Sequence, residues 1–150
     1  MKAKVVVTSG ATREPIDSVR FISNLSSGRT GATICEALVA RGFHVTQVAG
    51  VDSAQAQGVA RRETFTDHAS LDTALRRLAR DSACTAIVHA AAVGDFAVAE
   101  PRPDAKMQSC SPLRLPVTGG RCLSPSSVAT GRPRCAKRNW SRTRVFALSN

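Results

Sequence analysis

Over residues 4–91 the hydrophobic positions follow two alternating patterns, short continuous runs and runs spaced by three or four residues. The continuous runs are rich in β-branched residues and have the length of buried parallel strands. They predict strands over residues 4–8, 44–49 and 85–91, with a further short strand within 56–65.

The spaced runs predict two helices, because residues three and four positions apart share one face of a helix. The first is expected to begin near Ser27, with Ser26 or Ser27 as its cap, and to stop at Gly42. The second is expected over residues 67–81. Strands that alternate with helices in this way predict an α/β, Rossmann-like fold with a mostly parallel sheet flanked by helices.

Residues 9–26 separate the first strand from the first helix. They include Gly10, Pro15, Asn24 and four serines, a composition that predicts a long loop with at most one turn of helix. A loop of this kind between a strand and a helix is a common place for a phosphate to bind.

Two glycines, Gly28 and Gly31, stand at the predicted start of the first helix. Glycine lets an anion approach the backbone closely, and the unpaired N–H groups and dipole of a helix N-terminus favour negative charge. The same glycines would also allow tight packing between helix and strand, so both interpretations stay open. A GxGxxG directly after the strand is missing, since Gly10 stands by itself, which argues against an ordinary NAD(P) site.

The net charge of +10 is concentrated in the last part of the chain. Residues 1–104 carry 12 Lys and Arg and all 11 Asp and Glu, whereas residues 105–150 carry 9 Lys and Arg and no acid. Residues 118–150 are also rich in Ser, Pro and Gly and show no periodicity. We therefore expect a basic, irregular tail there, behind a nucleotide-binding domain over residues 1–117.

Other bulk features suggest an ordinary cytoplasmic protein. No run of 18 apolar residues occurs and the first residues lead straight into a strand, so we expect neither a membrane span nor a signal peptide. The five cysteines form no CxxC pair, which favours reduced thiols in the cytoplasm.

Two blocks of sequence match a known family. TSGATREPID followed by VRFISNLSSGRTG, and later HAAAVGDFAVAEPRPDAKMQS, resemble the signature of phosphopantothenate–cysteine ligase over residues 3–117. This ligase is the second half of the bifunctional coenzyme A biosynthesis flavoprotein of many bacteria. The resemblance implies that CTP, or ATP, activates the carboxylate of 4′-phosphopantothenate to an acyl-nucleotide with release of pyrophosphate. The amine of cysteine then displaces the nucleotide, and Mg²⁺ accompanies the triphosphate.

The resemblance also implies site residues. It assigns catalysis to Asn24, at the acyl-nucleotide, and to Lys106, on a loop that closes over the triphosphate. Asp95 would contact the nucleotide directly or through Mg²⁺. Together with the small residues expected at the strand ends, the nucleotide- and phosphate-binding set is Gly10, Arg20, Ser26, Ser27, Gly28, Ala90, Ala91, Ala92, Asp95 and Lys106.

The family would continue beyond residue 117 with a further strand, and residues 145–150 resemble it. We therefore expect a truncated or frameshifted member, inactive as this fragment if essential parts are missing, with residues 118–139 read from a disturbed frame. The family forms homodimers, and the interface would lie in the affected part.

Two other functions stay open. An NAD(P)-dependent oxidoreductase shares the fold, with Asp52 after the second strand as a ribose-binding acid, but that class relies on a catalytic Tyr and the chain has none. A non-enzymatic fragment could bind nucleic acid through its basic tail. The tail lacks interleaved aromatic residues, which argues against nucleic acid as the partner.

Overall fold

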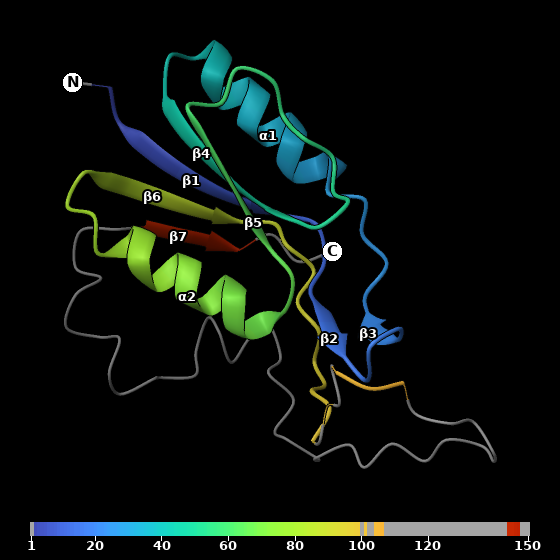
Figure 1. Ribbon diagram of the computed structural model, residues 1–150. Coiled ribbons are helices and arrows are strands. Elements are labelled where there is room, and N and C mark those ends of the chain that lie inside the picture. The colour runs from blue at the N-terminus through green and yellow to red at the C-terminus, as the bar shows by residue number, and fades with distance from the viewer. Residues whose placement is uncertain (1, 100, 102–103, 107–143, 148–150) are drawn as a thin grey trace.

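Five parallel strands form one sheet in the computed structural model, which describes residues 2–99, 101, 104–106 and 144–147. Across the sheet the strands follow the order β5-β4-β1-β6-β7 (Figure 1). Their bounds are Lys4–Ser9 for β1, His44–Gly50 for β4, Arg61–Phe65 for β5, Cys84–His89 for β6 and Arg144–Ala147 for β7. Counted along the chain within this sheet, the order is 3-2-1-4-5, which matches five strands of the doubly wound Rossmann order, so the predicted fold class is confirmed.

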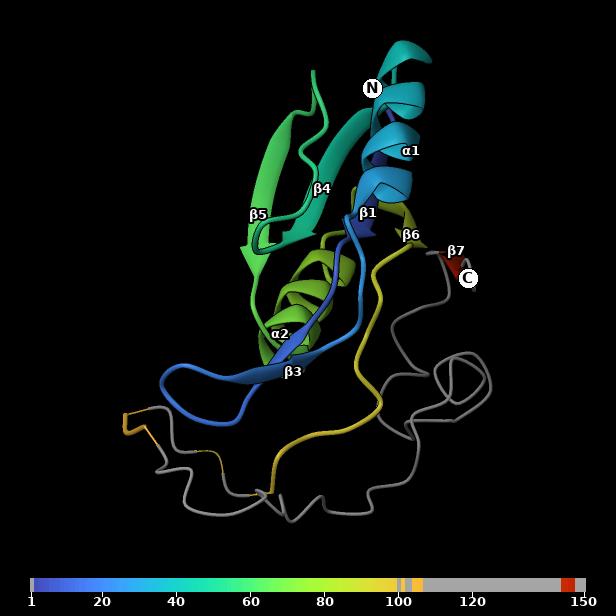
Figure 2. The same ribbon diagram turned by 90° about the vertical axis from the view of Figure 1, so that its right-hand side faces the viewer.

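The two helices of the described chain cover opposite faces of the sheet (Figures 1 and 2). Helix α1 (Arg29–Ala40) packs on β1 and β4, and α2 (His68–Ala79) packs on β5 and β6. Side chains alternate across a strand, so Val5 and Val7 join the core under α1 while Val6 joins the core under α2. The opposite faces follow because the right-handed crossovers on either side of β1 run in opposite directions.

The starts of the two helices differ in how they are capped. Asp67 caps α2, where its carboxylate accepts the N–H of Ser70 and the Ser70 hydroxyl accepts the N–H of Asp67. In α1 the cap position is held by Gly28, with φ 71° and no side-chain cap. The prediction of a serine cap is therefore wrong, because the backbone must turn in the left-handed region at this point to enter the helix.

The segment between β1 and α1 is a β-hairpin rather than the predicted irregular loop. Strands β2 (Arg13–Pro15) and β3 (Phe21–Ser23) pair antiparallel beyond the carboxyl ends of the main sheet (Figure 2). Asp17 closes the turn between them, because its buried Oδ1 accepts the N–H groups of Val19 at 3.0 Å and Arg20 at 2.8 Å. The side-chain turn supplies the order that the composition did not reveal.

Strands β4 and β5 are joined by residues 51–60 without a helix. Buried Gln47 of β4 holds this connection on the α1 face. Its amide nitrogen, Nε2, donates to the carbonyl of Ala54 at 3.0 Å and to Ser9 Oγ at 3.1 Å, and its Oε1 accepts the N–H of Ala56 at 3.0 Å. The buried amide is thus bonded on both sides, as a polar group in a core requires.

Strand β7 extends the sheet at β6, with Val145 opposite Ile87 in parallel register. It lies at the beginning of the segment that resembles the family's next strand. Residues 118–143 of the predicted tail lie outside the described residues.

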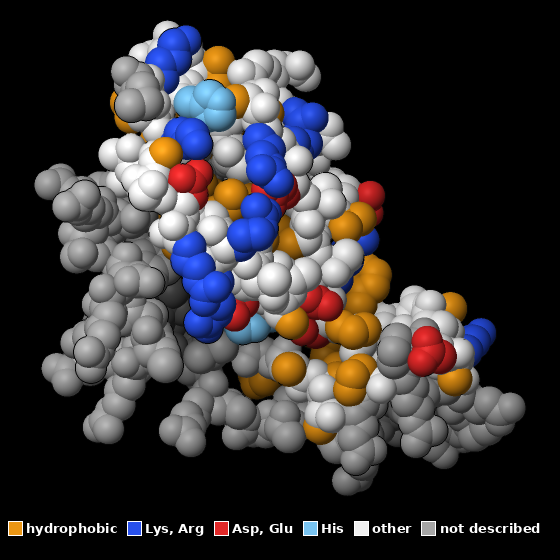
Figure 3. All heavy atoms as spheres, turned by 60° about the vertical axis from the view of Figure 1, so that its left-hand side comes forward, with side chains coloured by type: hydrophobic (Ala, Val, Ile, Leu, Met, Phe, Trp, Pro, Cys, Tyr) orange, Lys and Arg blue, Asp and Glu red, His pale blue; other side chains and the backbone are white. Residues whose placement is uncertain are grey.

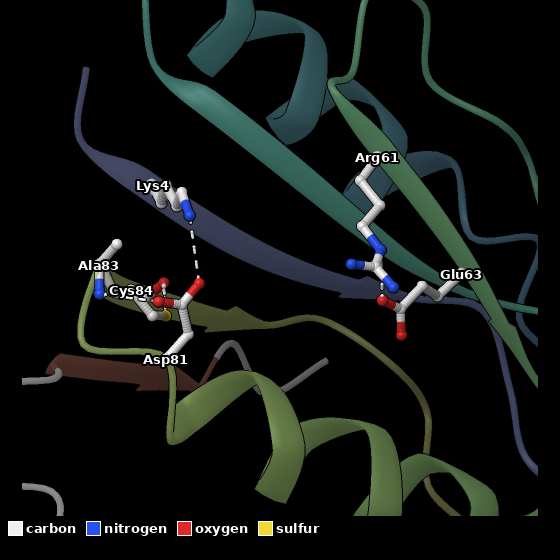
Figure 4. Close-up of polar contacts among 7 residues, drawn as sticks. Lys4, Arg61, Glu63, Asp81, Ala83 and Cys84 are labelled. Atoms are coloured by element: carbon white, nitrogen blue, oxygen red, sulfur yellow. Dashed lines mark hydrogen bonds and ion pairs between the residues drawn. The ribbon is translucent and has the colours of Figure 1, made fainter. Parts of the chain in front are cut away.

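Several oppositely charged side chains of residues 4–81 form ion pairs with one another. Figure 3 shows Lys and Arg side chains in a row with acidic side chains among them. Arg61 and Arg77 both pair with Glu63, and Arg61 Nε lies 2.8 Å from its Oε1 (Figure 4). At the start of β1, Lys4 Nζ lies 3.2 Å from Asp81 Oδ2 (Figure 4).

Candidate functional site

The carboxyl ends of β1 and β6 lie side by side at the centre of the sheet. From β1 the chain goes on to β4 on one side, whereas β6 has β7 on the other side. In open α/β sheets a ligand binds at the point where neighbouring strands continue in opposite directions, outside their carboxyl ends. The hairpin β2–β3 stands over this end of the sheet (Figures 1 and 2), so this is where a site is expected.

The predicted residues Ala90, Ala91 and Ala92 form the exit of β6 and are bound to the exit of β1. The Oγ1 of Thr8 accepts the N–H of Ala90 at 3.1 Å and that of Ala91 at 3.2 Å. The N–H of Ala92 donates to the carbonyl of Gly10 at 2.7 Å. Two loops that are far apart in sequence therefore make one continuous backbone surface.

Asn24 reaches this surface from the end of the hairpin. Its Nδ2 donates to the carbonyl of Val93 at 2.9 Å, and the neighbouring Ser23 Oγ donates to the carbonyl of Thr12 at 2.8 Å. The side chain of Asn24 is exposed. Asn24 is therefore placed beside the exits of both central strands rather than in a helix cap.

The glycines of the first loop permit close packing. A Cβ at Gly31 would lie 2.4 Å from Ser9 Cβ, and a Cβ at Gly28 would lie 2.8 Å from Ser53 Cβ and 3.1 Å from the nitrogen of Gly10. The packing interpretation of these glycines therefore holds. Because these glycines have no side chain, the first turn of α1 lies directly on the end of β1, and the unpaired N–H groups of the helix point outward there.

A pocket of about 200 Å³ opens at this helix start. Its lining is rich in backbone N–H groups and hydroxyls, with one cation, and consists of Leu25, Ser26, Ser27, Gly28, Arg29, Thr30, Gly31 and Ala90. Such a lining suits an anion, because N–H groups, hydroxyls and the helix dipole all favour negative charge. Four predicted site residues, Ser26, Ser27, Gly28 and Ala90, meet here.

A second pocket, of about 290 Å³, adjoins the first, and Leu25 and Ser26 line both. Asn24 lines the second pocket together with Arg13 and Asp52. Arg13 Nη2 lies 2.8 Å from Asp52 Oδ2. The side chain of Arg13 also lies over the ring of Phe21, 4.7 Å from its centre.

Sequence reasoning missed Arg13 as a pocket residue, although it belongs to the TREPID block, and considered Asp52 only as a ribose-binding acid. It also missed Glu14, whose buried carboxylate accepts the N–H of His68 at 2.9 Å. This bond and that from the N–H of Arg13 to the carbonyl of Thr66, at 2.6 Å, hold the hairpin to the start of α2. The sequence carries no signal for this bond, because it predicts a loop over residues 9–26 and only the structure reveals the strand that holds Glu14.

Six predicted residues line neither pocket. Gly10, Ala91 and Ala92 belong to the strand exits described above, and the other three are Arg20, Asp95 and Lys106. Arg20 pairs with Asp17, with Nε at 2.9 Å and Nη2 at 2.5 Å from Oδ2. Asp95 and Lys106 are exposed in the segment after β6. The N–H of Ser18 donates to the carbonyl of Ala105 at 3.4 Å, so this segment approaches the hairpin turn.

In the part of the chain that the structure describes, no group of three or more His, Cys, Asp or Glu could hold a metal ion. No helix among these same residues has the length and apolar character needed to cross a membrane. The side chains of Cys35 and Cys84 are buried thiols, and burial raises the pKa of Cys35 to about 11.

Comparison with known sequences supports the resemblance. The model of the family described as the DNA/pantothenate metabolism flavoprotein C-terminal domain matches residues 1–118. The chain is similar to the coenzyme A biosynthesis bifunctional protein CoaBC of Thermococcus kodakarensis, with 38% identity over 112 residues that cover 75% of this chain and 27% of that protein. The corresponding protein of Mycolicibacterium smegmatis is 41% identical over 100 residues, which cover 62% of this chain and 22% of that protein. The chain thus spans about a quarter of the length of these relatives.

Solved structures agree. The DNA/pantothenate metabolism flavoprotein from Streptococcus pneumoniae matches with a TM-score of 0.66 and 25% identity, over 77% of this chain and 59% of that one. The C-terminal domain of the coenzyme A biosynthesis bifunctional protein CoaBC matches with a TM-score of 0.59 and 28% identity, over 66% of this chain and 50% of that one. Because the family model covers well over half of its residues, this chain belongs to the family of the DNA/pantothenate metabolism flavoprotein C-terminal domain.

Proposed function

We propose that this chain provides the ligase site that joins 4′-phosphopantothenate and L-cysteine in coenzyme A biosynthesis, through an acyl-nucleotide made from CTP or ATP. The observation that carries the proposal is the anion-suited pocket at the start of α1, with Asn24 on the pocket that adjoins it. Membership of the family supports it, since the curated relatives are coenzyme A biosynthesis proteins.

The triphosphate would bind in the pocket at the helix start. Ser26 and Ser27 supply hydroxyls, Gly28 lets a phosphate approach the backbone, and Arg29 supplies a positive charge. Mg²⁺ would come with the nucleotide, because it is usually bound by one or two carboxylates together with substrate phosphates rather than by a cage of protein ligands. The exposed Asp95 fits such a single carboxylate, and the metal would spread the charge of the triphosphate.

Asn24 would act at the acyl carbon. Its amide nitrogen has two N–H groups, and the bond to Val93 uses one of them, which leaves the other for an oxygen that gains negative charge. A neutral amide can donate in this way at any physiological pH. Lys106 would neutralise phosphate charge from the segment after β6. Loss of one hydrogen-bond donor to the developing oxyanion typically lowers kcat by about 10²–10³-fold, and we expect this effect for Asn24→Ala.

Calorimetric titration of the purified chain with Mg·CTP, Mg·ATP and NADPH tests the site, followed by an assay of pyrophosphate release with 4′-phosphopantothenate. We expect saturable binding of one triphosphate, and pyrophosphate release that Asn24→Ala slows by about 10²–10³-fold. Thr33→Ala, an exposed change on α1 outside both pockets, is the matched control and should behave as the unchanged chain. Binding of NADPH in place of a triphosphate would favour an oxidoreductase, and binding of none of the three would overturn the proposal.

The proposed substrates are small cytoplasmic molecules, so we infer that the chain acts in the cytoplasm, and as a homodimer like the ligases it resembles. Cys35 and Cys84 are buried as thiols, which is consistent with a reducing compartment. Sedimentation at several concentrations would test the dimer.

A further inference from the structure

His89 stands at the end of β6 in parallel register with Thr8 of β1. Their side chains are on the same face of the sheet and make a hydrogen bond of 2.7 Å between Thr8 Oγ1 and His89 Nδ1. The next residue, Ala90, lines the pocket at the helix start. A titratable ring is therefore bonded to the same hydroxyl that holds the pocket lining.

The direction of the bond between Thr8 and His89 follows from the other partners of the hydroxyl. Thr8 Oγ1 accepts the N–H groups of Ala90, at 3.1 Å, and Ala91, at 3.2 Å, although Ala90 shares its N–H with the Thr8 carbonyl at 3.3 Å. A hydroxyl oxygen has two lone pairs and one proton. With both lone pairs in use, Thr8 can only donate to His89, so Nδ1 must be the unprotonated nitrogen and the ring must carry its proton on Nε2.

We propose that Thr8 and His89 are positioning residues of the pocket, which hold Ala90 and Ala91 in place only while His89 is neutral. A protonated ring presents an N–H at Nδ1, and Thr8 Oγ1 would then have to accept three donors. One backbone bond must break, and the exit of β6 loosens at Ala90. Anion binding at the pocket therefore weakens in mild acid. This effect on binding rests on the proposed function, whereas the coupling between the His89 ring and the loop does not.

The surroundings of His89 favour the neutral ring. Burial lowers its pKa below the ordinary value of 6.5. Among the described residues, the charged or titratable groups toward this end of the α2 face include Glu14 of β2, whose carboxylate is bonded to the N–H of His68, and Asp67 with His68 at the start of α2. Glu63 of β5 is level with Thr8 across β4 and is paired with Arg77 of α2. Lys4 of β1 lies at the far end of its strand, β7 places the uncharged Ala147 opposite His89, and α1 covers the other face.

The test is a pH titration between 8 and 5 of the ¹⁵N-labelled, ligand-free chain by NMR. We expect the neutral ring of His89 to carry its proton on Nε2, and the amide signals of Ala90 and Ala91 to shift with the midpoint of His89. In His89→Phe these amides should stop responding to pH, and Thr8→Ser should keep the response. A neutral His89 with its proton on Nδ1, or amides that ignore its titration, would overturn the inference.

A second arm measures the binding of Mg·CTP at pH 8 and at pH 5.5. Loss of about one hydrogen bond at the pocket predicts a Kd that rises about fivefold in the unchanged chain and stays level in His89→Phe. An equal rise in both chains would contradict the role in binding. If no nucleotide binds at either pH, the proposed function fails while the NMR titration still decides the coupling.

Discussion

Gly31 offers the sharpest test of how α1 rests on the sheet. A Cβ there would lie 2.4 Å from Ser9 Cβ and 3.0 Å from the carbonyl oxygen of Thr8. Carbon atoms in good contact are about 3.5–4.0 Å apart, so the overlap with Ser9 exceeds about 1 Å. The obstacles are the backbone and Cβ of a central strand, which cannot swing away as the end of a long side chain can. Gly31→Ala must therefore push the first turn of α1 off β1.

The sign of the effect is the informative part. In an exposed helix position, replacing Gly with Ala stabilises by about 1 kcal/mol. Overpacking a core by one methyl group costs about 1–3 kcal/mol, and an overlap with backbone belongs at the upper end of that range. An overpacking cost of about 3 kcal/mol less a gain in helix propensity of about 1 kcal/mol leaves a net loss. We therefore expect Gly31→Ala to lower the free energy of unfolding by about 2 kcal/mol.

Urea unfolding followed by circular dichroism measures this difference. Thr33→Ala on the same helix is the matched control, because the side chain is exposed and Ala is the better helix former, so it should gain a few tenths of a kcal/mol (roughly 0.5). Gly31→Ala should also weaken the binding of Mg·CTP, since it displaces the helix start. A Gly31→Ala chain as stable as the unchanged chain, or more so, would refute the close packing of helix on strand.

Three further predictions follow from buried groups. Glu14→Ala removes the acceptor of the His68 N–H and should lower the free energy of unfolding by about 1–2 kcal/mol, with a smaller loss for Glu14→Gln, measured in the same urea assay. Because burial raises the pKa of both Cys35 and Cys84, iodoacetamide at pH 8 should leave these two thiols unmodified in the folded chain and alkylate them in urea, as peptide mass spectrometry would show. The pKa of His89 is lower in the folded than in the unfolded chain, so the unfolded chain takes up the proton first. Stability should then fall as the pH drops below 6.5, and this part of the loss should be absent in His89→Phe.

The parts of the fold with a strong hydrophobic period were predictable from the sequence. The β-branched run of β1 and the spaced apolar residues of both helices report local structure, and the structure places these elements within a few residues of the predicted bounds. The β2–β3 hairpin was not predictable in this way, because its strands have three residues each and contain Pro15 and Glu14. What orders it is the Asp17 carboxylate and a bond to α2, and neither leaves a periodic signal.

In the candidate site, too, the residues that a local motif contains were predictable, and those that meet only in the folded chain were not. Ser26, Ser27 and Gly28 are neighbours in the sequence, so a motif can identify them. Arg13 and Asp52 meet across 39 positions, and Thr8 meets the loop after β6 across 82 or 83. In the sequence Thr8 is an ordinary strand residue, and only the register of β1 against β6 reveals that its hydroxyl holds the pocket lining.

The position of β7 in the sheet has a consequence for synthesis of the chain on the ribosome. In the part of the chain that the structure describes, the other four strands of the sheet and the two helices all lie before residue 90, whereas β7 is made more than fifty residues later, at Arg144–Ala147. During that interval a nascent chain would expose the outer edge of β6, whose free N–H and C=O groups are a template for pairing with another chain. Among the described strands, β7 thus covers the edge of β6 at which premature aggregation would begin.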